Sequence, residues 1–287
     1  MRDYRPPAWL VFFVPALIIA LAFIAGFQQD ASAKIEWEIL NKITLDESPK
    51  DVAVSNDGTT AYILGSRNIL IYSMQDNKIT DTIPITDQFS QLVMASDGER
   101  LFLTDSKSKQ VSIIRLSPIY EIEIGQSPVI GKKDAPVHVA AFIDYQCPYC
   151  AKVYPVLEQL LEKYPTQVNL ILKHYPLKMH RFARIASLAA LAAARQDKYA
   201  EVTRAFFKNY SGLNEQTVKK YAEEAGVKDL EAALNDPSLQ NIISQDVAVG
   251  AKVKVRGVPA LFVNGRVVKN RSLAGLSQMV ENELKKQ

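Results

Sequence analysis

The chain contains only two cysteines, Cys147 and Cys150, with two residues between them. A pair of thiols at this spacing is suited to thiol–disulfide exchange, in which a thiolate attacks a disulfide sulfur and forms a mixed disulfide. The pair follows an apolar run, Val137–Ile143, that suits a buried strand, and precedes a helical pattern over Ala151–Lys163. Cys147 is therefore expected at a helix N-terminus, where unpaired backbone N–H groups and the helix dipole stabilise a thiolate. We predict that Cys147 is the nucleophile and that Cys150, one turn into the helix, is the resolving thiol.

Three other uses of the cysteine pair fit the sequence less well. A zinc site would need two more ligands, but no third cysteine exists and the histidines are only His138, His174 and His180. A structural disulfide would close too short a loop to gain much chain entropy. The Cys-Pro-Tyr-Cys motif also occurs in glutaredoxins, which are small cytosolic proteins without an export segment or a long helical insert. We therefore expect no metal ion and no cofactor, with the redox-active Cys147–Cys150 disulfide as the reactive group.

The elements after the cysteines follow a defined order. Gln167–Leu172 has the pattern of a second strand, and from about residue 179 to 252 helix-forming residues dominate without a strand pattern. Residues 260–268 fit a hairpin with an Asn-Gly turn, and a last helix carries apolar residues from Leu273 to Leu284. This order predicts an α/β domain over residues 137–287 with a helical insert at about 179–252.

Two segments of this domain resemble the DsbA-like thiol–disulfide oxidoreductases. Phe142–Cys150 (FIDYQCPYC) resembles the active-site run of that family, and Arg256–Gly265 (RGVPALFVNG) resembles its cis-proline loop and following hairpin. His174–Leu177 (HYPL) also resembles the family. The resemblance implies a thioredoxin fold with an inserted helical domain. It also implies a cis bond between Val258 and Pro259, with the Val258 backbone facing the cysteines and able to bind an extended substrate.

The direction of the exchange is less defined than its type. Val258 before the proline resembles the oxidases of the family, so the resemblance favours donation of a disulfide to reduced or unfolded exported proteins. Tyr149 replaces the histidine that the strongest oxidases carry between their cysteines, whereas Pro148 suits the first helical turn. Ala141 stands where thioredoxin and DsbA itself carry a buried acid, and Asp144 is either a substitute for it or a solvated or capping residue. We expect an oxidant weaker than the strongest oxidases; an isomerase or reductase kept reduced by a membrane or soluble redox partner is the alternative.

Other candidate residues have ordinary structural explanations. Lys173 and His174, at the end of the second strand, either lie near the cysteines and tune their pKa or are ordinary strand-end residues. His138, in an apolar strand, is expected to pack in the core. Three aromatic residues of the insert are expected in its core or on an apolar surface that binds unfolded chains: Tyr199, Phe206 and Phe207.

The N-terminus predicts export. Residues 8–27 form twenty uncharged residues after Arg2 and Arg5, long enough to cross a membrane with the N-terminus in the cytoplasm. We expect residues 1–33 to anchor the chain as a single transmembrane helix, with the rest on the outer, periplasmic side. Cleavage after Ala31-Ser32-Ala33, with release to the periplasm, is the alternative.

Residues 34–116 differ from the rest because apolar and polar residues alternate, which is typical of strands. The pattern repeats after 40 residues: Ser55-Asn56-Asp57-Gly58 matches Ala95-Ser96-Asp97-Gly98, and Ile43 matches Ile83. This period resembles the blades of YVTN-type β-propellers. Two blades are too few to close a propeller, so their edges must be covered by the other domain, another copy of the chain or a partner. We expect a small all-β module that acts as a spacer, forms a homo-oligomer, or carries an interaction function of its own.

The composition agrees with this division. The chain has 287 residues, 48% of them hydrophobic, so it can bury the cores of about two domains. Pro and Gly punctuate residues 117–136, which we expect to be a linker. The net charge of +3 is too small to indicate a nucleic-acid partner, and we expect none.

Overall fold

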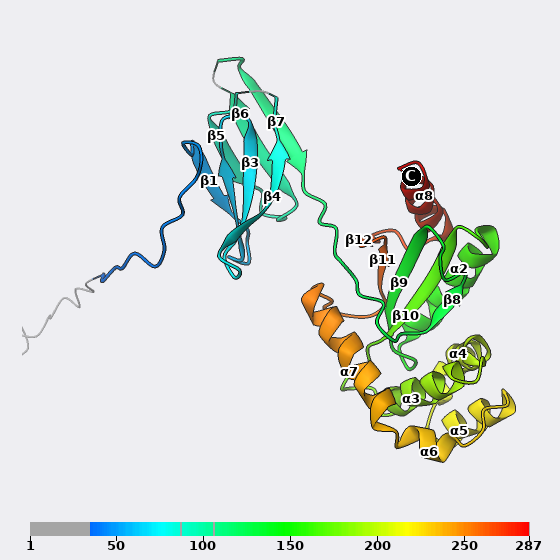
Figure 1. Cartoon of the computed structure of the whole chain (residues 1–287). Coiled ribbons are helices and arrows are strands. Elements are labelled where there is room, and N and C mark those ends of the chain that lie inside the picture. The colour runs from blue at the N-terminus through cyan, green and yellow to red at the C-terminus, as the bar shows by residue number, and fades with distance from the viewer. Residues whose placement is uncertain (1–34, 87, 106, 287) are drawn as a thin grey trace, which may run out of the picture.

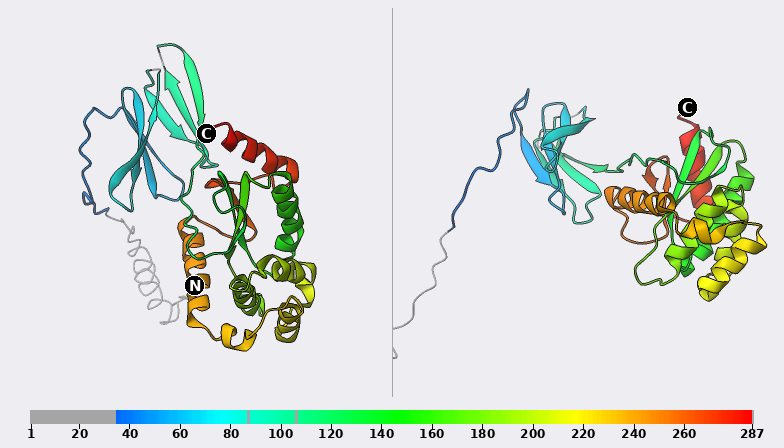
Figure 2. Two further views of the ribbon diagram at one scale, coloured as in Figure 1. Left: turned by 45° about the vertical axis from the view of Figure 1, so that its right-hand side comes forward. Right: turned by 60° about the horizontal axis from the view of Figure 1, so that its bottom comes forward.

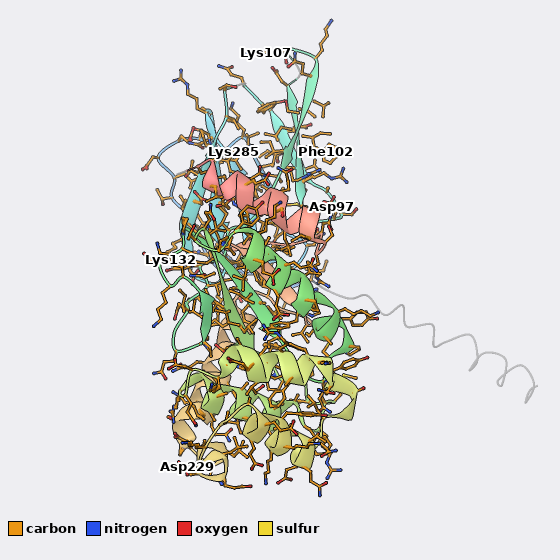
Figure 3. The ribbon with its side chains drawn as sticks, turned by 90° about the vertical axis from the view of Figure 1, so that its right-hand side faces the viewer. Asp97, Phe102, Lys107, Lys132, Asp229 and Lys285 are labelled. Carbon is orange, nitrogen blue, oxygen red and sulfur yellow. The ribbon has the colours of Figure 1, made fainter. Side chains whose placement is uncertain are left out.

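The computed structural model describes residues 35–86, 88–105 and 107–286 of the chain. The predicted membrane segment, residues 8–27, lies outside these described residues. Within the described ranges, no helix is both long and apolar enough to cross a membrane. The described chain forms a small β-module and a larger α/β domain, joined by an extended segment (Figure 1). Two further views show the same separation (Figure 2), and Lys107 of the module and Asp229 of the insert lie at opposite ends of the molecule (Figure 3).

The β-module consists of two antiparallel sheets. The first contains β1 (Asp51–Val54), β2 (Thr60–Leu64), β3 (Asn68–Ser73) and β4 (Lys78–Pro84) in that order. The second contains β5 (Gln91–Met94), β6 (Arg100–Asp105) and β7 (Gln110–Arg115). Sequential strands pair as neighbours in both sheets, as the alternating pattern predicts for hairpins.

The same turn opens both sheets. Gly58 and Gly98 have φ angles of 69° and 68°, which glycine adopts without the steric cost that a Cβ imposes. The N–H of Gly58 donates to the carbonyl of Ser55 at 2.8 Å, and that of Gly98 donates to the carbonyl of Ala95 at 2.9 Å. The Asp-Gly pair of each repeat therefore makes the same turn, 40 residues apart.

The α/β domain is built on a five-stranded sheet in the order β12-β11-β9-β10-β8. Its strands are β8 (Val129–Gly131), β9 (Val137–Ile143), β10 (Val168–His174), β11 (Ala260–Val263) and β12 (Arg266–Val267). β9 and β10 are parallel, and the other pairs are antiparallel. β9 and β10 are buried along nearly their whole length, which explains their continuous apolar sequences.

Helices cover both faces of this sheet. α2 (Pro148–Lys163) and α8 (Leu273–Leu284) pack with the insert helices in one large core, whereas Phe142 and Phe262 of the opposite face pack near the end of α7 (Pro237–Lys252). Between β10 and β11 the chain forms only helices: α3 (Ala183–Ala194), α4 (Tyr199–Lys208), the short 3₁₀ helix η2 (Tyr210–Gly212), α5 (Glu215–Glu224), α6 (Leu230–Leu234) and α7.

Part of the segment expected to be a linker is integrated in the α/β domain. Val129–Gly131 forms β8, which pairs with β10, and Ile119 forms a bridge with Arg266. The Tyr120 ring packs edge-on against Phe262, with 5.9 Å between ring centroids. The expectation of a linker over residues 117–136 is therefore wrong for these residues. A three-residue strand is too short to show an alternating pattern, and its proline and glycine neighbours conceal it.

Two ion pairs also connect the module to the α/β domain. Lys254 Nζ lies 2.8 Å from Asp57 Oδ2, in the turn of the first repeat. Lys269 pairs with Glu99, beside the turn of the second repeat. Because both pairs are largely exposed, each contributes little to stability on its own.

Candidate active site

Cys147 is the residue that precedes the first turn of α2. Its backbone is extended, with φ −78° and ψ 121°, and Pro148 occupies the first helical turn, where a missing N–H costs no hydrogen bond. The Cys147 N–H donates to the Asp144 carbonyl at 3.1 Å. The Cys147 side chain is 4% exposed, and both cysteines are free thiols in this structure. The thiol sulfur therefore lies at the positive end of a 16-residue helix.

The segment after α7 brings a proline to the same edge of the sheet. β11 begins at Ala260, whose Cα pairs with Phe142 near the end of β9. The preceding Val258–Pro259 bond is cis, as the resemblance implied. The Cys147 Sγ lies 3.6 Å from the Val258 carbonyl oxygen, to which the thiol donates. The structure thus brings together Cys147, Val258 and Pro259, which are more than 100 residues apart in the chain.

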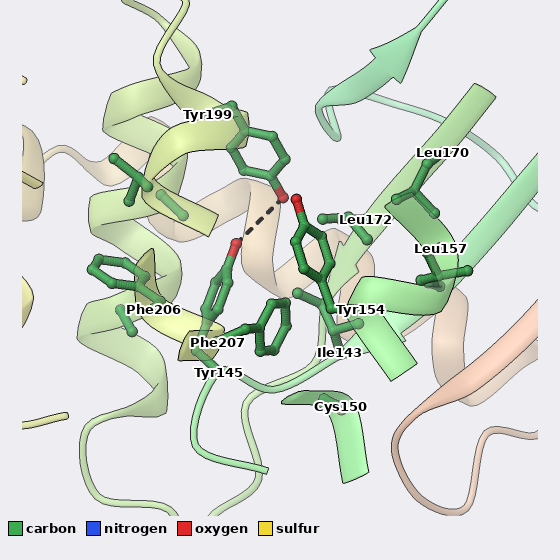
Figure 4. Packing of buried hydrophobic residues seen from close by; sticks show 14 of the residues in the cluster. Ile143, Tyr145, Cys150, Tyr154, Leu157, Leu170, Leu172, Tyr199, Phe206 and Phe207 are labelled. Atoms are coloured by element: carbon green, nitrogen blue, oxygen red, sulfur yellow. Dashed lines mark hydrogen bonds between the residues drawn. The ribbon is translucent and has the colours of Figure 1, made fainter. Parts of the chain in front are cut away.

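Cys150 lies one turn further along α2 and is completely buried (Figure 4). Burial raises the pKa of its thiol well above the usual value, and a hydrogen bond from the Asp144 backbone offsets only part of this effect. A negative charge on Cys147 or Asp144 raises the Cys150 pKa further. The two sulfurs therefore differ strongly in environment, although only two residues separate them.

Asp144 is fully buried, so the alternative of a solvated side chain is wrong. Its Oδ1 accepts a hydrogen bond from the Gln146 N–H at 2.7 Å, and its Oδ2 accepts one from the Leu177 N–H at 2.8 Å. His180 Nδ1 lies 2.9 Å from the same Oδ2. The carboxylate therefore ties the active-site loop to the segment that follows β10.

Two further residues of the loop attach it to the insert. The Gln146 side chain accepts from the Phe182 N–H at 2.6 Å and donates to the Leu213 carbonyl at 3.2 Å. The Tyr145 ring stacks at a tilt on Phe207, 4.9 Å between centroids, and its hydroxyl lies 3.0 Å from Thr203 Oγ1 (Figure 4). The helical insert thus holds the loop that carries the cysteines.

The sequence indicated some of these residues and missed others. Tyr149 is exposed beside Cys147, whereas the insert aromatics Tyr199, Phe206 and Phe207 are buried, so they form a core and no binding surface. His180 and Gln146 were not singled out, because only the tertiary fold brings His180 to Asp144 and Gln146 to Leu213. Across the described residues, no group of three or more His, Cys, Asp or Glu side chains is arranged to hold a metal ion.

Lys173 and His174 are fully buried, so they are not ordinary strand-end residues. Lys173 Nζ lies 3.0 Å from Asp246 Oδ1 on α7. His174 points to the other side, where its Nε2 lies 3.3 Å from the Tyr199 hydroxyl and its ring contacts Tyr145. His174 therefore packs behind the active-site loop.

The buried His174 predicts a specific loss of stability in acid. Burial lowers its pKa from the ordinary 6.5 to about 4, and the ring's Nδ1 has no hydrogen-bond partner among the described residues. Because the unfolded chain binds the proton more readily, stability is complete above pH 6.5 and falls as the pH drops toward 4, by about 3 kcal/mol. In urea denaturation at pH 7 and pH 4.5, wild type should lose more stability than His174→Phe. Parallel losses in the two proteins would contradict the prediction.

A sequence model described as Thioredoxin matches residues 123–282, which is more than half of the chain. The chain belongs to the thioredoxin family. The α/β domain is accordingly a thioredoxin-like domain with a helical insert, and the match begins upstream of β8, within the segment that packs on the sheet.

Similar proteins include oxidoreductases and transporters. The Na⁺/H⁺ antiporter NhaA 3 of Salinispora tropica is 35% identical over 142 residues, 48% of this chain and 22% of that protein. The probable disulfide bond formation protein D of Bacillus cereus is 28% identical over 175 residues, 55% of this chain and 78% of that protein. A thioredoxin-like oxidoreductase from Silicibacter pomeroyi DSS-3 is similar in structure, with a TM-score of 0.51 and 28% identity over 56% of this chain and 94% of its own. The chain thus spans about a fifth of the length of the antiporter, and the similarity to the other two proteins identifies a DsbA-like thiol–disulfide oxidoreductase domain.

Proposed function

We propose that the protein is an exported disulfide oxidase that forms mixed disulfides through Cys147 and donates its disulfide to folding proteins. The observation that carries the proposal is the position of the Cys147 sulfur, at the start of α2 and 3.6 Å from the Val258 carbonyl beside the cis-proline. A substrate chain that reaches this sulfur meets the Val258 backbone, which can pair with an extended segment. The similarity to a relative named for disulfide bond formation supports the oxidising direction.

The substrate step is balanced without any external oxidant. A substrate thiolate attacks Cys147 of the oxidised pair, the Cys147–Cys150 bond breaks, and Cys150 leaves with the electron pair and takes a proton. A second substrate thiolate then attacks the mixed disulfide and releases Cys147, so the substrate is oxidised and the pair is reduced by two electrons. Because burial raises the Cys150 pKa, the released Cys150 is held as a thiol rather than a thiolate. A membrane or soluble redox partner must then reoxidise the pair.

We also propose that residues 8–27 hold the protein in the cell membrane, with the β-module and the thioredoxin domain on the outer side. The twenty uncharged residues after Arg2 and Arg5 support this placement, with cleavage after Ala33 as the alternative. Membrane fractionation of the full chain, with and without an alkaline wash, distinguishes an integral anchor from a released domain.

The reduction potential tests the direction of the exchange. We expect a value between about −270 and −120 mV, above thioredoxin and below the strongest oxidases, and catalysed oxidation of a reduced peptide. The matched variant is Tyr149→His, which should raise the potential because an imidazolium beside Cys147 would stabilise its thiolate. A potential near −270 mV, with the pair kept reduced in the cell, would identify a reductase or isomerase and overturn the proposal.

A further inference from the structure

The two sheets of the β-module are copies of one unit, and each sheet has two distinct faces. We name as the trailing face of the first repeat the side with Ala53, Leu64 and Ile69, and as the leading face of each repeat the opposite side. The trailing face of the first repeat packs on the leading face of the second, through Leu92, Leu101 and Leu103. Two polar contacts accompany this packing: the Leu92 N–H donates to Asp51 Oδ2 at 2.8 Å, and Asn56 Nδ2 donates to the Ser96 carbonyl at 2.7 Å.

The two outer faces of the module are apolar and uncovered in this chain. Val111, on the trailing face of the second repeat, is 63% exposed, whereas Ile69, at the same position of the first repeat, is completely buried. Val52, on the leading face of the first repeat, is 56% exposed, but its equivalent Leu92 is 2% exposed. Val93 and Ile113 continue the exposed trailing face, and Val54 continues the exposed leading face. Each outer face therefore has the composition of the face that is buried inside the module.

The second sheet also lacks the fourth strand that completes the first. By the 40-residue period, that strand would follow β7 at residues 118–124, but Ile119 bridges to Arg266 and Tyr120 packs on Phe262 of the thioredoxin domain. β7 is therefore left as a sheet edge, with open backbone hydrogen-bonding groups.

A segment with the sequence of this missing strand lies before β1. Residues 38–45 (EILNKITL) match residues 78–85 (KITDTIPI), which include β4: both have isoleucine at the second and sixth positions and an aliphatic residue at the eighth. This segment forms no strand among the described residues and runs away from the sheets, in dark blue in Figure 1. Only its end is held, because Leu45 packs with Ala61, Ile63 and Tyr72 on the leading face of the first repeat.

We propose that a second copy of this chain packs its first repeat on the trailing face of the second repeat and supplies residues 38–45 as the fourth strand beside β7. The new contact reproduces the contact between the two repeats of one chain, so the same apolar positions are buried. A chain cannot supply the strand to its own β7, because Leu45 holds the segment on the opposite side of the module. Such a head-to-tail contact repeats until it closes, and propellers of roughly four to eight blades correspond to about two to four copies.

The pairing register inside the chain predicts which residues meet between copies. Ile83 of β4 lies opposite Ile69 of β3. Ile43 is the equivalent of Ile83, and Val111 is the equivalent of Ile69, because Leu64 pairs with Ile69 and Thr104 pairs with Val111. Ile43 of one copy should thus lie opposite Val111 of the next, at a Cα separation of about 5 Å that a disulfide can bridge.

Disulfide cross-linking between two differently tagged full chains tests the proposal. Both chains carry Cys147→Ser and Cys150→Ser, one with Ile43→Cys and the other with Val111→Cys. We expect a mixed cross-linked pair on oxidation of the mixture in detergent. A matched mixture of Ile43→Cys with Ile69→Cys should give none, because Ile69 is already opposite Ile83.

The molar mass of the full chain gives a second, independent measurement. Wild type should contain two or more copies, and Val111→Lys should reduce it to one copy, because a charge is placed in the contact. Met74→Lys, at an exposed site in the turn between β3 and β4, should leave the mass unchanged. A single-copy wild type, an oligomer that Val111→Lys leaves intact, or the absence of the Ile43–Val111 cross-link would each overturn the proposal. None of these readouts depends on disulfide exchange, so they are separate from the test of the proposed function.

Discussion

Cys147→Ser is expected to reduce the oxidation of a reduced peptide to the uncatalysed rate, whereas Cys150→Ser is expected to trap substrate. The reason is the different position of the two sulfurs. Cys147 lies at the helix start, against the Val258 carbonyl, where a substrate chain can approach. Cys150 is completely buried, so it can reach only the Cys147 sulfur. A chain that keeps Cys147 but lacks Cys150 can form the mixed disulfide but cannot resolve it.

Non-reducing electrophoresis after incubation with an oxidised peptide or protein measures the trapped species. Cys150→Ser should give a covalent adduct that dithiothreitol removes, and the variant lacking both cysteines should give none. Cys147→Ser should also give no adduct, because its remaining thiol is inaccessible and its pKa is raised. An adduct formed by Cys147→Ser but not by Cys150→Ser would reverse the assigned roles. Full activity of Cys147→Ser would remove the proposed function altogether and leave the β-module as the functional part.

The strand and hairpin around the active site could be predicted from the sequence because their signals are local. Val137–Ile143 is continuously apolar, and the structure places it as the central strand β9 with both faces covered. The Asn264-Gly265 turn forms as expected, with φ angles of 43° and 77° at its two residues. The first turn of α2 follows from the proline after Cys147. Each of these features depends on residues within about ten positions of one another.

The surroundings of the cysteines could not be predicted, because they depend on contacts between distant segments. No local pattern distinguishes a carboxylate in the loop that is solvated from one that is buried. Asp144 is buried because the Leu177 N–H and His180 reach it from the segment after β10, more than 30 residues away. In the same way, β8 becomes a strand only because β10 presents an open edge to it. Sequence periodicity carries no information on such pairings.

Lys173 is the clearest case of a misleading sequence signal. A lysine at the end of a strand is usually solvated, yet its side chain and that of Asp246 are each only 2% exposed. The ammonium has three acceptors: Asp246 Oδ1 at 3.0 Å, Ser127 Oγ at 2.8 Å and the Ile124 carbonyl at 2.8 Å. Asp246 also accepts from the Ser127 hydroxyl at 2.6 Å and from the His174 N–H at 2.8 Å. One buried ion pair therefore joins β10, α7 and the segment before β8.

This arrangement predicts a large effect of Asp246→Ala on stability. The substitution leaves the Lys173 ammonium buried without a countercharge, which costs about 3–5 kcal/mol in comparable buried pairs. That is a large part of the about 5–15 kcal/mol by which a domain is typically stable. Urea denaturation followed by far-UV circular dichroism measures the loss. The control is Glu224→Ala, which removes an exposed pair with Lys220 and should change stability by no more than about 0.5 kcal/mol.

Two further variants separate the charge of Asp246 from its hydrogen bonds. The double variant Lys173→Met with Asp246→Leu removes both charges and should recover most of the stability lost by Asp246→Ala, since no unpaired charge remains. It should not recover all of it, because the buried His174 N–H still lacks its acceptor, at a cost of about 1–3 kcal/mol. Asp246→Asn keeps that acceptor but loses the charge. A double variant no more stable than Asp246→Ala would mean that the lost hydrogen bonds, and not the unpaired Lys173, dominate the penalty.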